Sequence, residues 1–260
     1  MIHLSAHAPF EIAFTLAMPH GLVAGLHLPG GATLPPPSVP EDVLERLHPD
    51  DAAHARTLHG FRQNEFVGGR LAMGVVFQEL GLRPTSIPQD VHGAPVLPAG
   101  LVGSITHKKD LAVAIVARTP GSSVATLDRG GSGDVGASGP SLGIGIDLED
   151  LDRAREGIEE RVLRPEEREA VAGLPGHRKW VDVATRFALK EAIYKGIHPF
   201  VQRYVGFAEA SVRTSPDGTD EVTLHLTDAA GPYVVDARHT WVEGPGAVPR
   251  VLATVRIRPA

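Results

Sequence analysis

Two segments of the sequence carry charged residues at spacings that suit phosphate chemistry. The first is Gly143–Glu149, GIGIDLE, an apolar run that ends in Asp147 and Glu149. Residues i and i+2 of a β-strand point to the same face, so the two carboxylates should lie side by side. Like charges repel, and a divalent cation with oxygen ligands would relieve this repulsion. Ordinary solvated acids at a strand end are the alternative.

The second segment is Arg186–Lys195, RFALKEAIYK, which has the periodicity of a helix. Glu191 and Lys195 are four residues apart and therefore neighbours on the helix surface. They form either a simple surface ion pair or part of a site. In a site, Glu191 would add a third carboxylate to a magnesium set with Asp147 and Glu149, and Lys195 would hold a phosphate.

A third segment, Gly103–His107 (GSITH), precedes the apolar run that starts at Leu111. We expect His107 at a boundary between a strand and a turn, where a hydroxyl, an imidazole and backbone N–H groups can contact phosphate. The chain has 13 histidines, most of which must be structural or solvated, so His107 alone is weak evidence.

The composition bounds what the protein can be. The chain has 260 residues, 42% of them hydrophobic, a net charge of −6 and a pI near 6.1. This balance argues against binding to nucleic acid or to a membrane surface. The absence of cysteine excludes disulfides, thiolate zinc sites and cysteine nucleophiles. No apolar run reaches the roughly 18 residues of a membrane helix, and the first residues lack the character of a signal peptide, so we expect a cytoplasmic protein.

The pattern predicts two α+β lobes. Gly and Ser dominate residues 129–141, which we expect to be a flexible connector between lobes at residues 1–128 and 142–260. The further expected elements are two strands within residues 10–28, helices that open at Pro40 and Pro49, a long helix that ends at Gly81, helices from Pro165 and over residues 178–195, and strands at residues 221–226, 233–237 and 251–257.

Four blocks, taken in order, resemble the signature of the 4′-phosphopantetheinyl transferases. They are Phe66–Ala72 (FVGGRLA), Gly103–His107 (GSITH), Gly145–Glu149 (GIDLE) and Phe187–Lys195 (FALKEAIYK). Each block is weak alone, but their order and spacing match the family over residues 61–210. GSITH and KEAIYK are most similar to the subgroup typified by the enterobactin-synthase transferase.

The resemblance implies an α+β fold in which two similar α/β lobes of one chain are related by a pseudo-twofold axis, with the active site at the lobe interface. The implied reaction needs coenzyme A and Mg²⁺ and a partner, an acyl or peptidyl carrier protein. A serine of the carrier attacks the β-phosphate of coenzyme A and takes the phosphopantetheine group, and 3′,5′-ADP leaves. The resemblance also implies a monomer.

Site residues follow from the resemblance position by position. Asp147, Glu149 and Glu191 would bind Mg²⁺, and Lys195 would hold the pyrophosphate of coenzyme A. The residues that would contact the nucleotide or its phosphates are Arg62, Arg70, Thr106, His107 and Lys190.

The serine must lose a proton to a carboxylate or to a metal-bound water, and we expect Glu191 or Glu167 to take this role. Lys190 is a poor base because an exposed lysine stays protonated at neutral pH, and it should pair with an acid or a phosphate. Two other functions stay open. A magnesium-dependent phosphohydrolase would use the same acids to activate water, and a non-catalytic module would bind coenzyme A without transferring a group.

Overall fold

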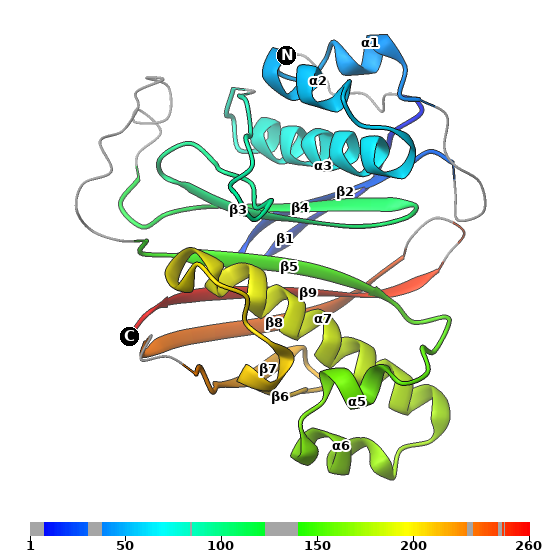
Figure 1. Cartoon of the computed structure of the whole chain (residues 1–260), viewed down its shortest axis with the longest axis vertical. Helices are drawn as coiled ribbons and strands as arrows, with labels where there is room; N and C mark the ends of the chain where they lie inside the picture. The colour runs from blue at the N-terminus through cyan, green and yellow to red at the C-terminus, as the bar shows by residue number, and fades with distance from the viewer. Residues whose placement is uncertain are drawn as a thin grey trace. The chain divides into compact units, whose positions relative to one another are not determined.

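A computed structural model describes residues 8–30, 38–83, 85–122, 140–227, 231–243, 246 and 248–260. The chain divides into two compact units, residues 1–135 and 136–260. Residues 129–139 of the predicted connector lie outside the described part. Figure 1 shows a β-sheet and a long helix in each unit.

Unit 1 carries a four-stranded antiparallel sheet in the order β1-β2-β4-β3. The helix α3 packs on β2 and β4 and forms one hydrophobic core with them. The elements of unit 1 are β1 (Glu11–Met18), β2 (Gly21–His27), α1 (Glu41–Leu44), α2 (Pro49–Ala55), α3 (Gly60–Glu79), β3 (Leu101–Lys108) and β4 (Leu111–Arg118).

Unit 2 carries a five-stranded antiparallel sheet in the order β5-β9-β8-β7-β6. The helix α7 packs on β5 and β9, and a second hydrophobic core lies between them. The elements of unit 2 are β5 (Gly143–Asp150), α5 (Ile158–Val162), α6 (Pro165–Ala172), α7 (Gly176–Val201), the 3₁₀ helix η1 (Phe207–Glu209), β6 (Ala210–Arg213), β7 (Thr219–Leu224), β8 (Tyr233–Glu243) and β9 (Pro249–Pro259).

Glycines allow α7 to lie directly on β5. A Cβ atom on Gly145 would stand 1.9 Å from the carbonyl oxygen of Ala192, and one on Gly143 would stand 2.0 Å from that of Gly196. No side chain fits at these distances. Gly143 and Gly145 alternate with the residues of the other strand face and share the face of Asp147, so the close approach brings the middle of α7 to the acidic end of β5.

The predicted α+β class is confirmed, since both units combine an antiparallel sheet with helices. The predicted elements are found, with shifted ends. The helix α7 continues past Lys195 through Pro199 and ends before Gln202, whose φ of 49° is left-handed. The strand β6 and the helix α5 were not predicted, because four or five residues carry too little periodicity.

Replacing Gly145 by alanine should destabilise the protein by about 2–4 kcal/mol, because backbone atoms of α7 cannot yield to the new methyl group. The matched control is Gly74→Ala in α3, where a Cβ meets nothing within 4 Å. This second change should stabilise the protein by about 0.5–1 kcal/mol. Denaturant unfolding measures both. Equal stabilities of the two variants would contradict the close approach.

The carboxylate of Glu209 anchors the segment that follows α7 through hydrogen bonds. Its two oxygens accept hydrogen bonds from Arg203 at 3.0 and 2.7 Å, from the backbone N–H of Gly206 at 3.1 Å and from that of Thr227 at 3.1 Å. The Arg203 hydrogen bonds, more than the backbone ones, lower the pKa of Glu209 to about 2. The carboxylate is therefore more stable in the folded chain than in the unfolded one.

Because the folded pKa lies below the unfolded one, this stabilisation is complete above the ordinary pKa of 4.5 and is lost as the pH falls toward 2. Glu209→Gln should lower the free energy of unfolding by about 1–2 kcal/mol at pH 7, and this deficit should shrink below pH 4.5. The control is Glu169→Gln at an exposed position on α6. A deficit that does not depend on pH would show that the charge of Glu209 is not what stabilises the fold.

Candidate active site

The acidic end of β5 meets Lys195 of α7. Asp147 and Glu149 are 6% and 2% exposed, so neither is an ordinary solvated acid. Nζ of Lys195 lies 2.7 Å from Oδ1 of Asp147 and also donates to the carbonyl of Ile146 at 3.0 Å. The structure thus joins the two predicted segments.

Glu149 has a cationic neighbour of its own. Nη2 of Arg155 lies 3.0 Å from Oε2 of Glu149, and the Arg155 side chain is half exposed while that of Glu149 is buried. A basic side chain of the protein therefore lies beside each of the two buried carboxylates. These cations supply the positive charge that two neighbouring acids require.

Glu191 is half-buried on α7, four residues before Lys195. Within the described ranges, no three His, Asp or Glu side chains are grouped so that they could hold a metal ion. Glu191 is thus not brought into one group with Asp147 and Glu149, and the predicted metal role of the three stays a prediction.

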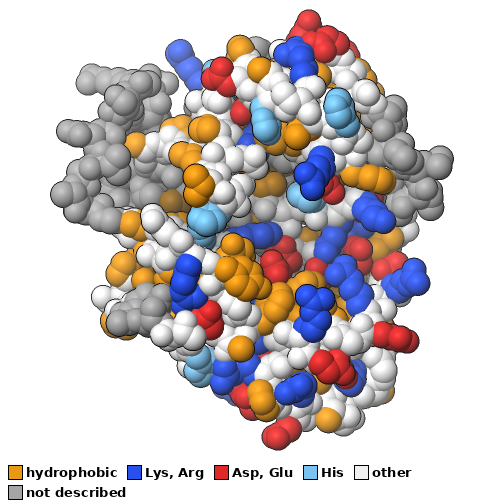
Figure 2. All heavy atoms as spheres, in the orientation of Figure 1, with side chains coloured by type: hydrophobic (Ala, Val, Ile, Leu, Met, Phe, Trp, Pro, Cys, Tyr) orange, Lys and Arg blue, Asp and Glu red, His pale blue; other side chains and the backbone are white. Residues whose placement is uncertain are grey.

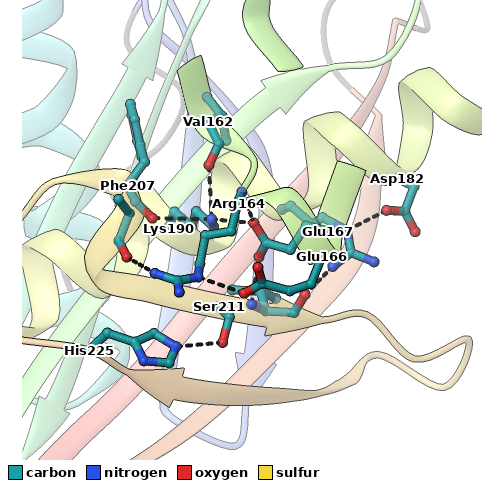
Figure 3. A network of polar contacts seen from close by, with 12 residues as sticks. Val162, Arg164, Glu166, Glu167, Asp182, Lys190, Phe207, Ser211 and His225 are labelled. Carbon is teal, nitrogen blue, oxygen red and sulfur yellow. Dashed lines mark hydrogen bonds and ion pairs between the residues drawn. The ribbon is translucent and has the colours of Figure 1, made fainter. Parts of the chain in front are cut away.

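Lys190 and Glu167 form an ion pair inside unit 2. Nζ of Lys190 lies 2.5 Å from Oε2 of Glu167, and the two side chains are 1% and 3% exposed. Lys190 also donates to the carbonyls of Val162 at 2.8 Å and Phe207 at 3.2 Å, as Figure 3 shows. Burial lowers the pKa of Lys190, and the contact with Glu167 opposes this shift. The predicted role of Glu167 as a base, and that of Lys190 in binding coenzyme A, stay predictions.

Aromatic side chains flank Glu191. Phe187 and Tyr194 lie on the same side of α7 as Glu191, because they are four residues before it and three after it. Phe187 packs edge-on against Phe207 at 5.6 Å between ring centroids, and Tyr194 packs against Tyr204 at 5.2 Å. Figure 2 shows hydrophobic side chains beside acidic and basic ones on the face over α7. This part of unit 2 offers both apolar and charged contacts to a ligand.

The predicted arginines of unit 1 differ in exposure. Arg62 is exposed on α3. Arg70 is buried, with Nε 3.7 Å from Oδ1 of Asp51 and the guanidinium carbon 4.2 Å from the centre of the Phe66 ring. Burial lowers the pKa of Arg70 against the opposing charge of Asp51.

Thr106 and His107 lie at the end of β3, so the predicted strand-to-turn boundary at His107 is confirmed. Thr106 is buried, and the half-exposed His107 has Nδ1 3.3 Å from Oε1 of Glu65 on α3. Sequence reasoning missed the acids that face these basic residues, Glu65 and Asp51. Both pairs join distant parts of the chain, and no local pattern signals them.

The described helices include none that is long and apolar enough to cross a bilayer.

Comparison with known families identifies the family of the chain. Residues 50–117 match the 4′-phosphopantetheinyl transferase N-terminal domain, and residues 143–246 match the 4′-phosphopantetheinyl transferase superfamily. The chain belongs to the 4′-phosphopantetheinyl transferase superfamily and is an enzyme of that class.

Two named relatives agree with this assignment. The chain is 30% identical over 221 residues to the 4′-phosphopantetheinyl transferase Svp of Streptomyces mobaraensis, covering 82% of this chain and 81% of Svp. It is 27% identical over 188 residues to PptT of Mycobacterium tuberculosis, covering 69% and 74%. A solved holo-(acyl-carrier-protein) synthase of Bacillus anthracis, in complex with CoA (3′,5′-ADP), is 26% identical with a TM-score of 0.37, over 46% of this chain and 100% of that one.

Proposed function

We propose that this chain transfers the 4′-phosphopantetheine group of coenzyme A to a serine of an acyl or peptidyl carrier protein in a magnesium-dependent reaction. The hydroxyl oxygen of the serine forms a bond to the β-phosphorus, and the bond between that phosphorus and the leaving phosphate oxygen breaks. The products are the holo carrier and 3′,5′-ADP, and the serine proton passes to a base on the enzyme.

The observation that carries this proposal is the junction of β5 and α7. Two buried carboxylates, Asp147 and Glu149, share one strand face, and the ammonium of Lys195 lies 2.7 Å from the first. Membership of the superfamily supplies the reaction class. A surface ion pair would not need two acids that are more than nine-tenths buried on one face of a strand.

Two of the three predicted ligands, Asp147 and Glu149, fit a magnesium ion. Mg²⁺ is commonly held by one or two carboxylates, with water and substrate phosphate as its other ligands, so the protein need not supply a third carboxylate. When bound, the ion would neutralise charge on the pyrophosphate. Glu191 would enter the set only after its side chain turns toward the two acids, given the absence of a three-acid group within the described ranges.

Lys195 and Glu191 take the remaining roles. The side chain of Lys195 is only a quarter exposed, so solvent would screen its charge weakly from the leaving pyrophosphate oxygens. We assign removal of the serine proton to Glu191, because the alternative, Glu167, is buried and its oxygens accept hydrogen bonds inside unit 2. Arg62, Arg70, Thr106 and His107 would contact the nucleotide and its phosphates.

Intact mass spectrometry of an apo carrier protein tests the transfer. With coenzyme A and Mg²⁺, the carrier should gain the mass of one phosphopantetheine group. The gain should vanish with EDTA and fall at least 100-fold in rate in Asp147→Ala, because one of the two buried acids is lost. Release of phosphate without carrier modification would instead indicate a phosphohydrolase. Binding of coenzyme A with neither product would indicate a binding module.

Metal binding can be measured without activity. Mn²⁺, as a stand-in for Mg²⁺, should bind the wild type, and Asp147→Asn and Glu149→Gln should each weaken this binding at least tenfold by removing one anionic ligand. The exposed Asp152→Asn is the control. Lys195→Met should bind Mn²⁺ more tightly, because a cation 2.7 Å from Asp147 is removed. Electron paramagnetic resonance of free Mn²⁺ gives the dissociation constants. Unchanged binding in Asp147→Asn would refute the metal site.

A further inference from the structure

We propose that Glu167 and Lys190 are positioning residues, a buried pair that holds the segment 204–207 against the face of α7 that carries Glu191, and that neither residue touches substrate. This inference rests on the proposed function, since it concerns how the same site is held.

The ammonium of Lys190 joins three separate segments to α7. Its three acceptors are the carbonyl of Val162 at the end of α5, the carboxylate of Glu167 on α6 and the carbonyl of Phe207 in η1. An ammonium has three N–H donors, so these contacts use all of them. No donor is left for a phosphate of coenzyme A.

Glu167 is equally occupied. Its Oε2 accepts from Lys190 and, at 2.7 Å, from the backbone N–H of Arg164, while its Oε1 accepts from the backbone N–H of Val212 at 2.7 Å. The contact with Arg164 caps the start of α6, and the contact with Val212 links α6 to β6. A general base needs an oxygen within reach of the proton it removes, and both oxygens of Glu167 already hold protein donors.

The Lys190–Glu167 pair is connected, through Phe207, to the aromatic side chains beside Glu191. Lys190 holds the carbonyl of Phe207, and the Phe207 ring packs against Phe187, one helical turn before Glu191. Tyr204, three residues before Phe207, packs against Tyr194 on the other side of Glu191 and is 64% exposed. Loss of the pair would therefore loosen the part of the surface that lies next to the proposed base.

Three variants separate positioning from chemistry. Glu167→Gln keeps an acceptor for the cap but leaves the buried Lys190 charge without a counter-charge, so kcat/KM should fall about tenfold or more, mainly through a higher KM. Lys190→Met should cause a similar loss. The double variant E167Q/K190M leaves no buried charge without a counter-charge, so its melting temperature should exceed that of E167Q, but it lacks the ammonium that holds Phe207, so its KM should stay above that of the wild type.

The control is Glu166→Gln, the exposed neighbour that pairs with Arg164 at 2.6 Å, which should leave both kcat and KM near the wild-type values. If Glu167 were the base, E167Q would lose kcat at least 100-fold while its KM stayed near the wild-type value. If Lys190 bound coenzyme A, K190M would weaken coenzyme A binding without lowering the melting temperature. Either result overturns the proposal.

A single variant still decides the matter if E167Q does not fold. Folded K190M with wild-type KM and melting temperature would refute positioning, because the three segments would then be held without the ammonium. A wild type that modifies no carrier would refute the proposed function instead, so the two failures are distinguishable.

Discussion

The site depends on one steric constraint, the absence of side chains where α7 crosses β5. A Cβ atom on Gly143 or Gly145 would stand less than 2.1 Å from a backbone atom of α7. Because glycine has no Cβ, the backbones of the strand and the helix can lie in direct contact. A larger residue at either position would push the helix outward. Lys195 would then move away from Asp147, whose buried carboxylate would lose the cation 2.7 Å from it.

In unit 1 a glycine also faces the sheet, but its near neighbours are side-chain atoms. A Cβ atom on Gly68 would stand 2.2 Å from the Leu28 side chain and 3.2 Å from that of Ala112. Arg70, two residues later, lies on another side of α3, where it is buried beside Asp51 and Phe66. In each unit a buried charged side chain has a partner of opposite charge from another element, Asp51 for Arg70 and Lys195 for Asp147.

The predictable part of the structure is the part that local pattern encodes. A short apolar run located β5 and helical spacing located α7, and the i, i+2 spacing of Asp147 and Glu149 placed both on one strand face. Partner choice was not predictable, because Lys190 selects Glu167 from 23 residues away and Val162 from 28 residues away. From the sequence, Glu167 is an acid in a family position. Only its contacts show that its two oxygens are occupied by protein donors.

The ion pairs of Asp147 and Glu149 differ from the buried pair of Lys190 and Glu167 in how easily they can be separated. Lys195 is a quarter exposed and Arg155 nearly half exposed, so an incoming metal ion or phosphate can compete with them at modest cost. Lys190 is 1% exposed, and separating it from Glu167 would strand two charges in a medium of low dielectric constant. Partly exposed pairs suit residues that must exchange partners during a reaction. Fully buried pairs suit residues that must keep theirs, which is why we propose that Asp147, Glu149 and Lys195 are the residues that exchange partners.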